Sequence, residues 1–298
     1  MSNSYSPKRW GNELSLMLNA VYAASPERFP VLVPQLAREF SAHRYPNDAI
    51  VMVEGEALGN FDGALIHGAK GWGIVYNKAL RSPGRINFTL AHEFGHYLLH
   101  RIAFPEGLHC GQDDMVRWDS AYRQIESQAN DFAATLLMPL NDFRRQIDAK
   151  AKPTLDDLGA CAERYGVSLI AAALRWLEYT ERRAVLVVSR EGFILWARSS
   201  ERALKTGAFF RTVNVPPVAI PFASLPEQPD LLEKSRGQIS HDSGVWFREP
   251  CDEFALVSDH YDFAISLLHL EPTSWNWLKE EEEEDSFDRM TRRIGGQR

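Results

Sequence analysis

The 298-residue sequence predicts an α+β fold, in which a small sheet packs on a pair of helices, and a helical segment and a mixed α/β C-terminal domain follow. Apolar residues recur at helical spacing over much of the first 180 positions. Short strand-like runs, separated by glycine and asparagine, interrupt this pattern between residues 49 and 76, and strand-like runs return only after residue 184. Hydrophobic residues make up 45% of the chain, which is enough for a core of ordinary size.

Helices are expected wherever apolar residues recur every three or four positions. The expected helical stretches are 9–45 (two helices), 82–101, 120–138, 139–149 and 154–179 (two helices separated at Gly166). Ser82 followed by Pro83 is a start signal for the helix at 82–101. Residues 103–119 contain a proline, two glycines and two adjacent aspartates, so we expect a loop there.

Strands are expected in short runs rich in branched and aromatic residues. The expected strands are 49–53, 64–66, 73–76, 184–188, 193–197, 245–247, 254–257 and 263–270. The proline-rich stretch 216–229 between them reads as a surface loop. The change from helical to strand-like pattern predicts a boundary near residue 181.

Charge and cysteine usage exclude several classes of protein. The net charge is −7, and Glu280 to Asp285 alone carry six negative charges, so the rest of the chain is nearly neutral and offers no electrostatic case for nucleic acid. The three cysteines are far apart and form no C-x-x-C pair, which argues against a disulfide framework or a cysteine-based metal cluster. A reducing, cytoplasmic setting is therefore expected. We expect no membrane helix, because no run of 18 apolar residues occurs.

The sequence His92-Glu93-Phe94-Gly95-His96 is an H-E-x-x-H motif on an expected helix. Residues four apart lie on one helical face, so the two imidazoles can meet one zinc ion. Glu93 would lie beside the metal without binding it, where it can take a proton from an attacking water molecule. The competing interpretation is a helix with two surface histidines.

A third metal ligand is needed to decide between these interpretations. Leu99 and Ile102 occupy the positions where the long histidine variant of the motif needs glycine and histidine, so that variant is excluded. Glu126 lies on the next expected helix, on a face that it shares with Ala129 and Ala133. A solvent-exposed helix charge is the alternative, but the small residues would let this helix pack closely on the motif helix, which favours a ligand.

Both helices resemble the ImmA/IrrE family of metallopeptidases. The blocks that carry the resemblance are Arg85 to His96, then Glu126-x-x-Ala129-Asn130-x-Phe132-Ala133, and Leu136-Leu137-Met138-Pro139. The match is close over about residues 70–140 and loose to about 200. It implies a gluzincin-like zinc endopeptidase, with His92, His96 and Glu126 as metal ligands and Glu93 as catalytic base. It also implies that the protein substrate is a helix-turn-helix transcriptional repressor, whose cleavage relieves repression in a stress or mobile-element response.

Other polar residues near the motif are candidates for supporting roles rather than for metal ligation. His100 would drift around the helix away from the metal, so packing or a hydrogen bond to a ligand is expected rather than ligation. Asn130 is expected either to support the site in the same way or to cap local backbone groups. Tyr76 is a candidate for stabilising an oxyanion, although a core tyrosine is the commoner explanation. Residues 155–179 have helix-turn-helix spacing, but the second helix is mostly apolar and offers chiefly Arg175, so packing is favoured over base readout.

Four regions follow from these observations. They are a zinc peptidase domain (1–150), a helix-turn-helix-like segment (151–182), a strand-rich sensor or recognition domain that is GAF-like in some family members (183–278), and a disordered acidic tail (279–298). The main alternative function is a non-proteolytic regulator that binds and sequesters a repressor, but binding alone would not need Glu93. A DNA-binding regulator acting through 155–179 is a weaker alternative, because that segment is nearly neutral.

Overall fold

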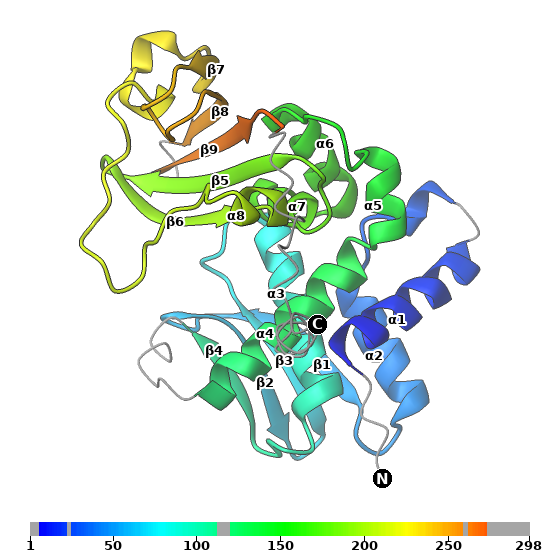
Figure 1. Cartoon of the computed structure of the whole chain (residues 1–298). Helices are drawn as coiled ribbons and strands as arrows, with labels where there is room; N and C mark the ends of the chain where they lie inside the picture. Colours follow the sequence, from blue (N-terminus) through cyan, green and yellow to red (C-terminus); the bar gives the residue numbers. More distant parts are fainter. Residues whose placement is uncertain (1–5, 23–24, 112–119, 259–261, 273–298) are drawn as a thin grey trace, which may run out of the picture. The chain divides into compact units, whose positions relative to one another are not determined.

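The computed structural model describes residues 6–22, 25–111, 120–258 and 262–272. The predicted acidic tail lies outside these residues. The chain divides into two compact units, residues 1–180 and 181–298. In Figure 1 the N-terminal unit is coloured from blue to green and the C-terminal unit from yellow-green to orange.

The N-terminal unit contains the helices that the sequence predicts. They are α1 (Pro7–Tyr22), α2 (Val33–Arg44), α3 (Pro83–His100), α4 (Ser120–Leu137), α5 (Leu140–Gln146), α6 (Leu155–Tyr165) and α7 (Leu169–Leu177), with the short 3-10 helix η1 at Pro26–Arg28. The start signal before α3 is confirmed, because Ser82 caps the helix by accepting a hydrogen bond from the amide of Arg85 at 3.3 Å.

Four strands form the sheet of this unit, in the order β1-β3-β2-β4. They are β1 (Ile50–Glu56), β2 (Phe61–Gly68), β3 (Gly71–Asn77) and β4 (Gly107–Gly111). Strand β1 runs parallel to β3, whereas β2 is antiparallel to both β3 and β4. The prediction of a loop throughout 103–119 is therefore wrong for β4. Gly107 has a φ of +106°, and a Cβ there would overlap the carbonyl oxygen of Leu65, so this glycine serves close strand pairing.

Helix α3 packs against β2 and β3, and α4 packs against α3. The two helices approach closely at Gly95, where a Cβ would lie 2.9 Å from Cδ1 of Phe132 and 3.3 Å from Cα of Ala129. The rings of Phe94 and Phe132 meet edge to face beside this point, with centroids 5.7 Å apart. The expected close packing of the motif helix on an alanine-lined helix is thus confirmed.

Helices α6 and α7 form the helix-turn-helix-like pair, and their turn packs on the body of the same unit. Gly166 ends α6 in the left-handed conformation, and its carbonyl accepts a hydrogen bond from Nδ2 of Asn87 at 3.1 Å. Arg175, the residue singled out for base readout, is only 3% exposed. It donates to the carbonyl of Met138 at 2.8 Å and to Glu178 at 2.6 Å. This arginine is used inside the unit rather than offered to a nucleic acid.

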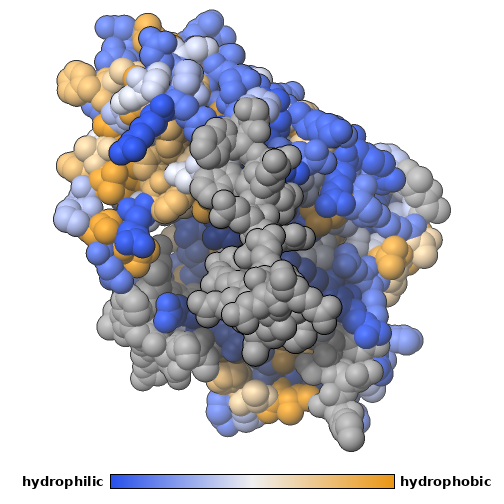
Figure 2. All heavy atoms as spheres, in the orientation of Figure 1, coloured by the Kyte–Doolittle hydropathy of each residue, from blue (hydrophilic) through white to orange (hydrophobic). Residues whose placement is uncertain are grey.

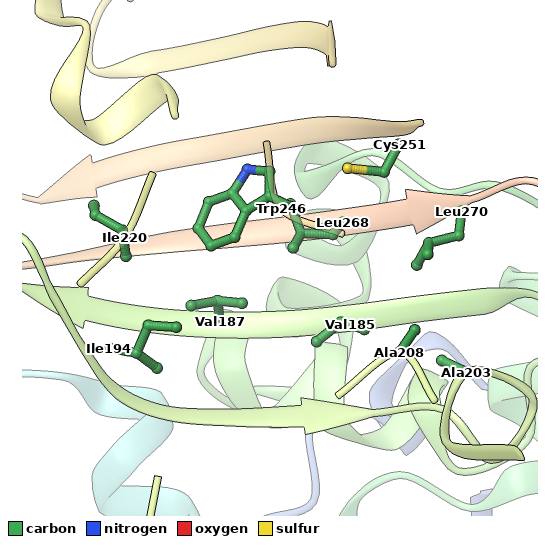
Figure 3. Packing of buried hydrophobic residues seen from close by; sticks show 10 residues of the cluster. All are labelled: Val185, Val187, Ile194, Ala203, Ala208, Ile220, Trp246, Cys251, Leu268 and Leu270. Atoms are coloured by element: carbon green, nitrogen blue, oxygen red, sulfur yellow. The ribbon is translucent and has the colours of Figure 1, made fainter. Parts of the chain in front are cut away.

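The C-terminal unit is built on a five-stranded antiparallel sheet in the order β6-β5-β9-β8-β7. Its elements are β5 (Arg183–Arg190), β6 (Phe193–Ser199), α8 (Glu201–Lys205), η3 (Leu225–Glu227), η4 (Pro229–Leu231), β7 (Arg236–His241), β8 (Cys251–Ser258) and β9 (Phe263–Leu270). The predicted strand at 245–247 is wrong. Trp246 lies in an irregular, bent segment between β7 and β8 and packs on Leu268 and its neighbours in the core of this unit (Figure 3).

A carboxylate lies inside this C-terminal unit. Glu253 is completely buried and accepts hydrogen bonds from Ser266 at 2.6 Å, Trp246 at 3.2 Å and the amide of Leu225 at 3.1 Å. Nε2 of His241 lies 2.7 Å from the same carboxylate. The cluster ties η3, β7, β8 and β9 together, and His241 thus has a structural role in this unit.

The surface in view is mainly hydrophilic, with hydrophobic patches gathered on the side of the C-terminal unit where β6 lies (Figure 2). Among the described residues, no helix is long and apolar enough to cross a membrane.

Candidate metal centre

Helix α3 carries the motif in its buried middle section. His92 is 8% exposed, and Glu93 and His96 are completely buried. The interpretation of two surface histidines therefore does not hold. The burial has a simple cause: α3 packs between the sheet and α4, and so little of its surface is left to solvent.

Three potential ligand atoms converge from the two helices. Nε2 of His92 and Nε2 of His96 lie 2.9 Å apart, and the Glu126 carboxylate faces both, with Oε2 at 3.2 Å from His92 and Oε1 at 3.2 Å from His96. Ligand atoms at the zinc distances of about 2.0–2.1 Å in a tetrahedron would be separated by roughly 3.3 Å, close to this spacing. Two imidazoles and one carboxylate are also a known donor set of catalytic zinc sites. The three residues thus fit a divalent metal ion. The side chain of Glu126 is 25% exposed, so solvent reaches the group from this side.

Burial and mutual contact shift the pKa values of these groups in different directions. Burial lowers the pKa of His96 to about 4. Burial by itself would also lower the pKa of His92, but the hydrogen bond to Glu126 and the charges of Glu93 and Glu126 outweigh it and raise this pKa. Burial would raise the pKa of Glu126, but the two histidines hold it well below its usual range. Glu126 is thus a carboxylate at neutral pH, as a metal ligand must be.

In each of the two histidines the second ring nitrogen, Nδ1, also faces a polar side chain. Nδ1 of His92 lies 3.0 Å from Oδ1 of Asn130, and Nδ1 of His96 lies 3.0 Å from Nδ1 of His100. Nε2 of His100 in turn lies 2.8 Å from Oε1 of Gln128. The supporting contacts expected for Asn130 and His100 are present. Gln128 was missed from the sequence, where only its place two residues after Glu126 could have drawn attention to it.

Glu93 follows His92 directly and points toward the sheet. A Cβ on Gly63 of β2 would lie 2.8 Å from Oε1 of Glu93, so this glycine makes room for the carboxylate. Tyr76, the candidate for oxyanion stabilisation, lies with its ring over Gly55 of β1, where a Cβ would be 2.9 Å from the ring. Its ring is therefore placed toward β1, and an oxyanion role gains no support from this position.

Comparison with known proteins finds a family similarity over the residues that form this site. Residues 47–177 match the family model of the IrrE N-terminal-like domain, Peptidase_M78. Among solved structures, a transcriptional regulator from Mycobacterium tuberculosis is 13% identical, with a TM-score of 0.48, over 86% of this chain and 75% of that chain. None of the curated proteins matches the chain. The matched segment contains the sheet, α3 and α4, so the elements that carry the candidate metal centre lie within the region that is similar to this family.

Proposed function

We propose that the N-terminal unit is a zinc-dependent endopeptidase, with His92, His96 and Glu126 as metal ligands and Glu93 as catalytic base. The observation that carries the proposal is the convergence of the two Nε2 atoms and the Glu126 carboxylate within 3.2 Å of one another. The match to a peptidase family over the same residues supports it.

The roles follow from the chemistry of each group. A bound zinc ion would polarise the scissile carbonyl and lower the pKa of water toward about 7. Glu93 would accept the proton of the attacking water and deliver it to the nitrogen of the leaving amine. His92, His96 and Glu126 supply three protein ligands, which leaves a further coordination position for water and substrate.

The proposed substrate is a DNA-binding repressor of the helix-turn-helix class, and its cleavage would relieve repression in a stress or mobile-element response. The support is the resemblance of the motif blocks to the ImmA/IrrE family, together with the family match. A cytoplasmic setting would bring the enzyme and such a repressor together.

The test is incubation of the purified full chain, loaded with zinc, with a repressor encoded near its gene. We expect cleavage at one site by the wild type and no cleavage by Glu93→Gln, which keeps the ligands but removes the base. Metal analysis should show one zinc ion per chain in both proteins and loss of zinc in Glu126→Ala. Equal cleavage by wild type and Glu93→Gln would refute the proposed mechanism.

The Glu93→Gln variant also distinguishes an endopeptidase from a regulator that only binds and sequesters the repressor. If Glu93→Gln and wild type both bind the repressor and neither cuts it under activating conditions, the chain acts by binding. The burial of an acidic residue against Gly63 argues for catalysis, because a binding function gives no reason to keep a carboxylate there.

A further inference from the structure

His96, His100 and Gln128 form a row of hydrogen-bonded side chains. The row begins at Nδ1 of His96, the ring nitrogen that does not face His92 and Glu126. Nδ1 of His96 lies 3.0 Å from Nδ1 of His100, and Nε2 of His100 lies 2.8 Å from Oε1 of Gln128. Both histidines are buried, with exposed fractions of 0% and 5%. Two of these groups come from α3 and the third from α4, the helix that also supplies Glu126.

The Gln128 side chain at the end of this row determines which ring nitrogen of each histidine carries the hydrogen. A neutral imidazole has one N–H and one bare nitrogen, and an amide oxygen can only accept. Because Oε1 of Gln128 faces Nε2 of His100, that nitrogen carries the hydrogen and Nδ1 of His100 is bare. The facing Nδ1 of His96 must then be the donor. Nε2 of His96 is consequently bare, and this is the atom that faces His92 and Glu126.

If the Gln128 amide had the opposite orientation, both histidines would be in the opposite tautomer. If the amide nitrogen of Gln128 faced His100, every proton would move to the other nitrogen of its ring. Nε2 of His96 would then carry a hydrogen at the position where a metal ligand needs a lone pair. The orientation of one side-chain amide on α4 therefore decides whether His96 can bind a metal without first changing its tautomer.

We propose that His100 and Gln128 are positioning residues, which hold His96 in the tautomer and ring orientation whose Nε2 binds the divalent metal. The inference deepens the proposed function and rests on its metal centre. The two residues act through His96 and have no contact with substrate in the proposal. Their effect is on metal affinity, for which hydrogen bonds to ligand histidines count about 10–100-fold.

Zinc affinity of three full-length variants tests the role of the acceptor. Gln128→Leu removes the acceptor and keeps the size of the side chain. Gln128→Glu keeps an acceptor in either orientation, because both terminal atoms of the carboxylate are oxygens. Gln124→Leu is the matched control, since Gln124 is an exposed residue of the same helix. By competition with a chelator, we expect about tenfold or greater loss of zinc affinity in Gln128→Leu. We expect Gln128→Glu to bind zinc at least as tightly as wild type, and Gln124→Leu to be unchanged.

The tautomer of His96 is measured separately, by nitrogen NMR of the metal-free proteins. We expect the hydrogen on Nδ1 in wild type and in Gln128→Glu, and a population with hydrogen on Nε2 in Gln128→Leu. Equal weakening in Gln128→Leu and Gln128→Glu would show that packing matters and not the acceptor, and would overturn the inference. An unchanged tautomer and zinc affinity in Gln128→Leu would overturn it as well. Neither readout depends on proteolysis, so a chain that follows this pattern and cuts no substrate would contradict the proposed function alone.

Discussion

At the scale of single residues, Gly63 has the most specific relation to Glu93. It lies in β2 where α3 crosses the sheet, and a Cβ there would lie 2.5 Å from Cγ2 of Thr89 and 2.8 Å from Oε1 of Glu93. The absence of a side chain at this one position determines how far the Glu93 carboxylate can extend over the strand. The position of the proposed base thus depends on a residue outside the motif.

Gly63→Ala should therefore displace Glu93 while leaving the metal ligands in place. We expect zinc content to stay near one per chain and the rate of cleavage to fall. Overpacking should lower the free energy of unfolding by about 1–3 kcal/mol. Denaturant titration, metal analysis and the cleavage assay measure the three effects. Gly68→Ala in the same strand is the control, because its nearest non-neighbouring atom would be 3.9 Å away. Wild-type cleavage by Gly63→Ala would contradict this account.

Sequence spacing is enough to place His92 and His96 on one face of a helix with Glu93 beside them, because four residues make about one helical turn whatever the tertiary structure. Glu126 required a second argument, from small neighbours and family resemblance. Gln128 and Gly63 could not be found in this way. Their contacts depend on the rotation of α4 relative to α3 and on the position where α3 crosses β2, and neither leaves a periodic pattern in the sequence.

At the scale of elements, Asp142 joins α5 to α6. It accepts hydrogen bonds from Arg164 at 2.9 Å, from Tyr165 at 2.7 Å and from Arg145 at 2.7 Å, and it is 7% exposed. Burial would raise its pKa, but these hydrogen bonds outweigh burial and hold the pKa below its ordinary value. The contact fixes the helix-turn-helix-like pair through its first helix.

Asp142→Asn should destabilise the N-terminal unit in a pH-dependent way. The folded-state pKa is below the unfolded value of about 3.9, so the stabilisation is present above that pH and is lost as pH falls through the folded pKa. We expect a loss of about 2 kcal/mol at pH 7, and a difference from wild type that narrows below about pH 4. Urea titrations at several pH values measure it, with the exposed Glu163→Gln on α6 as control. A difference that stays constant at acid pH would contradict the prediction.

The helices and most strands were predictable because their periodicity is local, whereas β4 and β7 were missed for different reasons. Gly107 at the start of β4 is a turn signal in sequence, but in three dimensions it permits close approach to β2. Strand β7 is an edge strand with alternating exposure and little apolar character. The apolar run 245–247 instead packs on the core from a bent segment outside the strands, so its hydrophobicity reflects burial rather than a strand.

At the scale of the whole molecule, the candidate metal centre lies in only one of the two units. Metal that binds the folded state stabilises the unit that holds the site, by about 2.7 kcal/mol when its concentration is a hundred times the dissociation constant. The C-terminal unit has a core of its own, built on β5, β6, β8 and β9 (Figure 3). Stability should therefore respond to zinc unequally along the chain.

Amide hydrogen exchange with and without a chelator measures how strongly zinc stabilises each of the two units. Removal of zinc should speed exchange in peptides of α3 and α4 and leave β5 and β9 unchanged. Glu126→Ala should show no response to zinc in either unit. Equal changes in both units would mean that the two unfold together.

The five residues from Glu126 to Asn130 provide the carboxylate of the candidate metal centre and acceptors to His92 and His100. A slip of α4 along α3 by a single residue would move these side chains by about 1.5 Å and turn them by about 100°. All three partnerships would then be lost together. The contact of Gly95 with Ala129 and Phe132 sets the separation of the helices at this level. The geometry of the candidate metal centre thus depends on one apolar contact, so a substitution that changes this contact on either helix should disturb all three interactions.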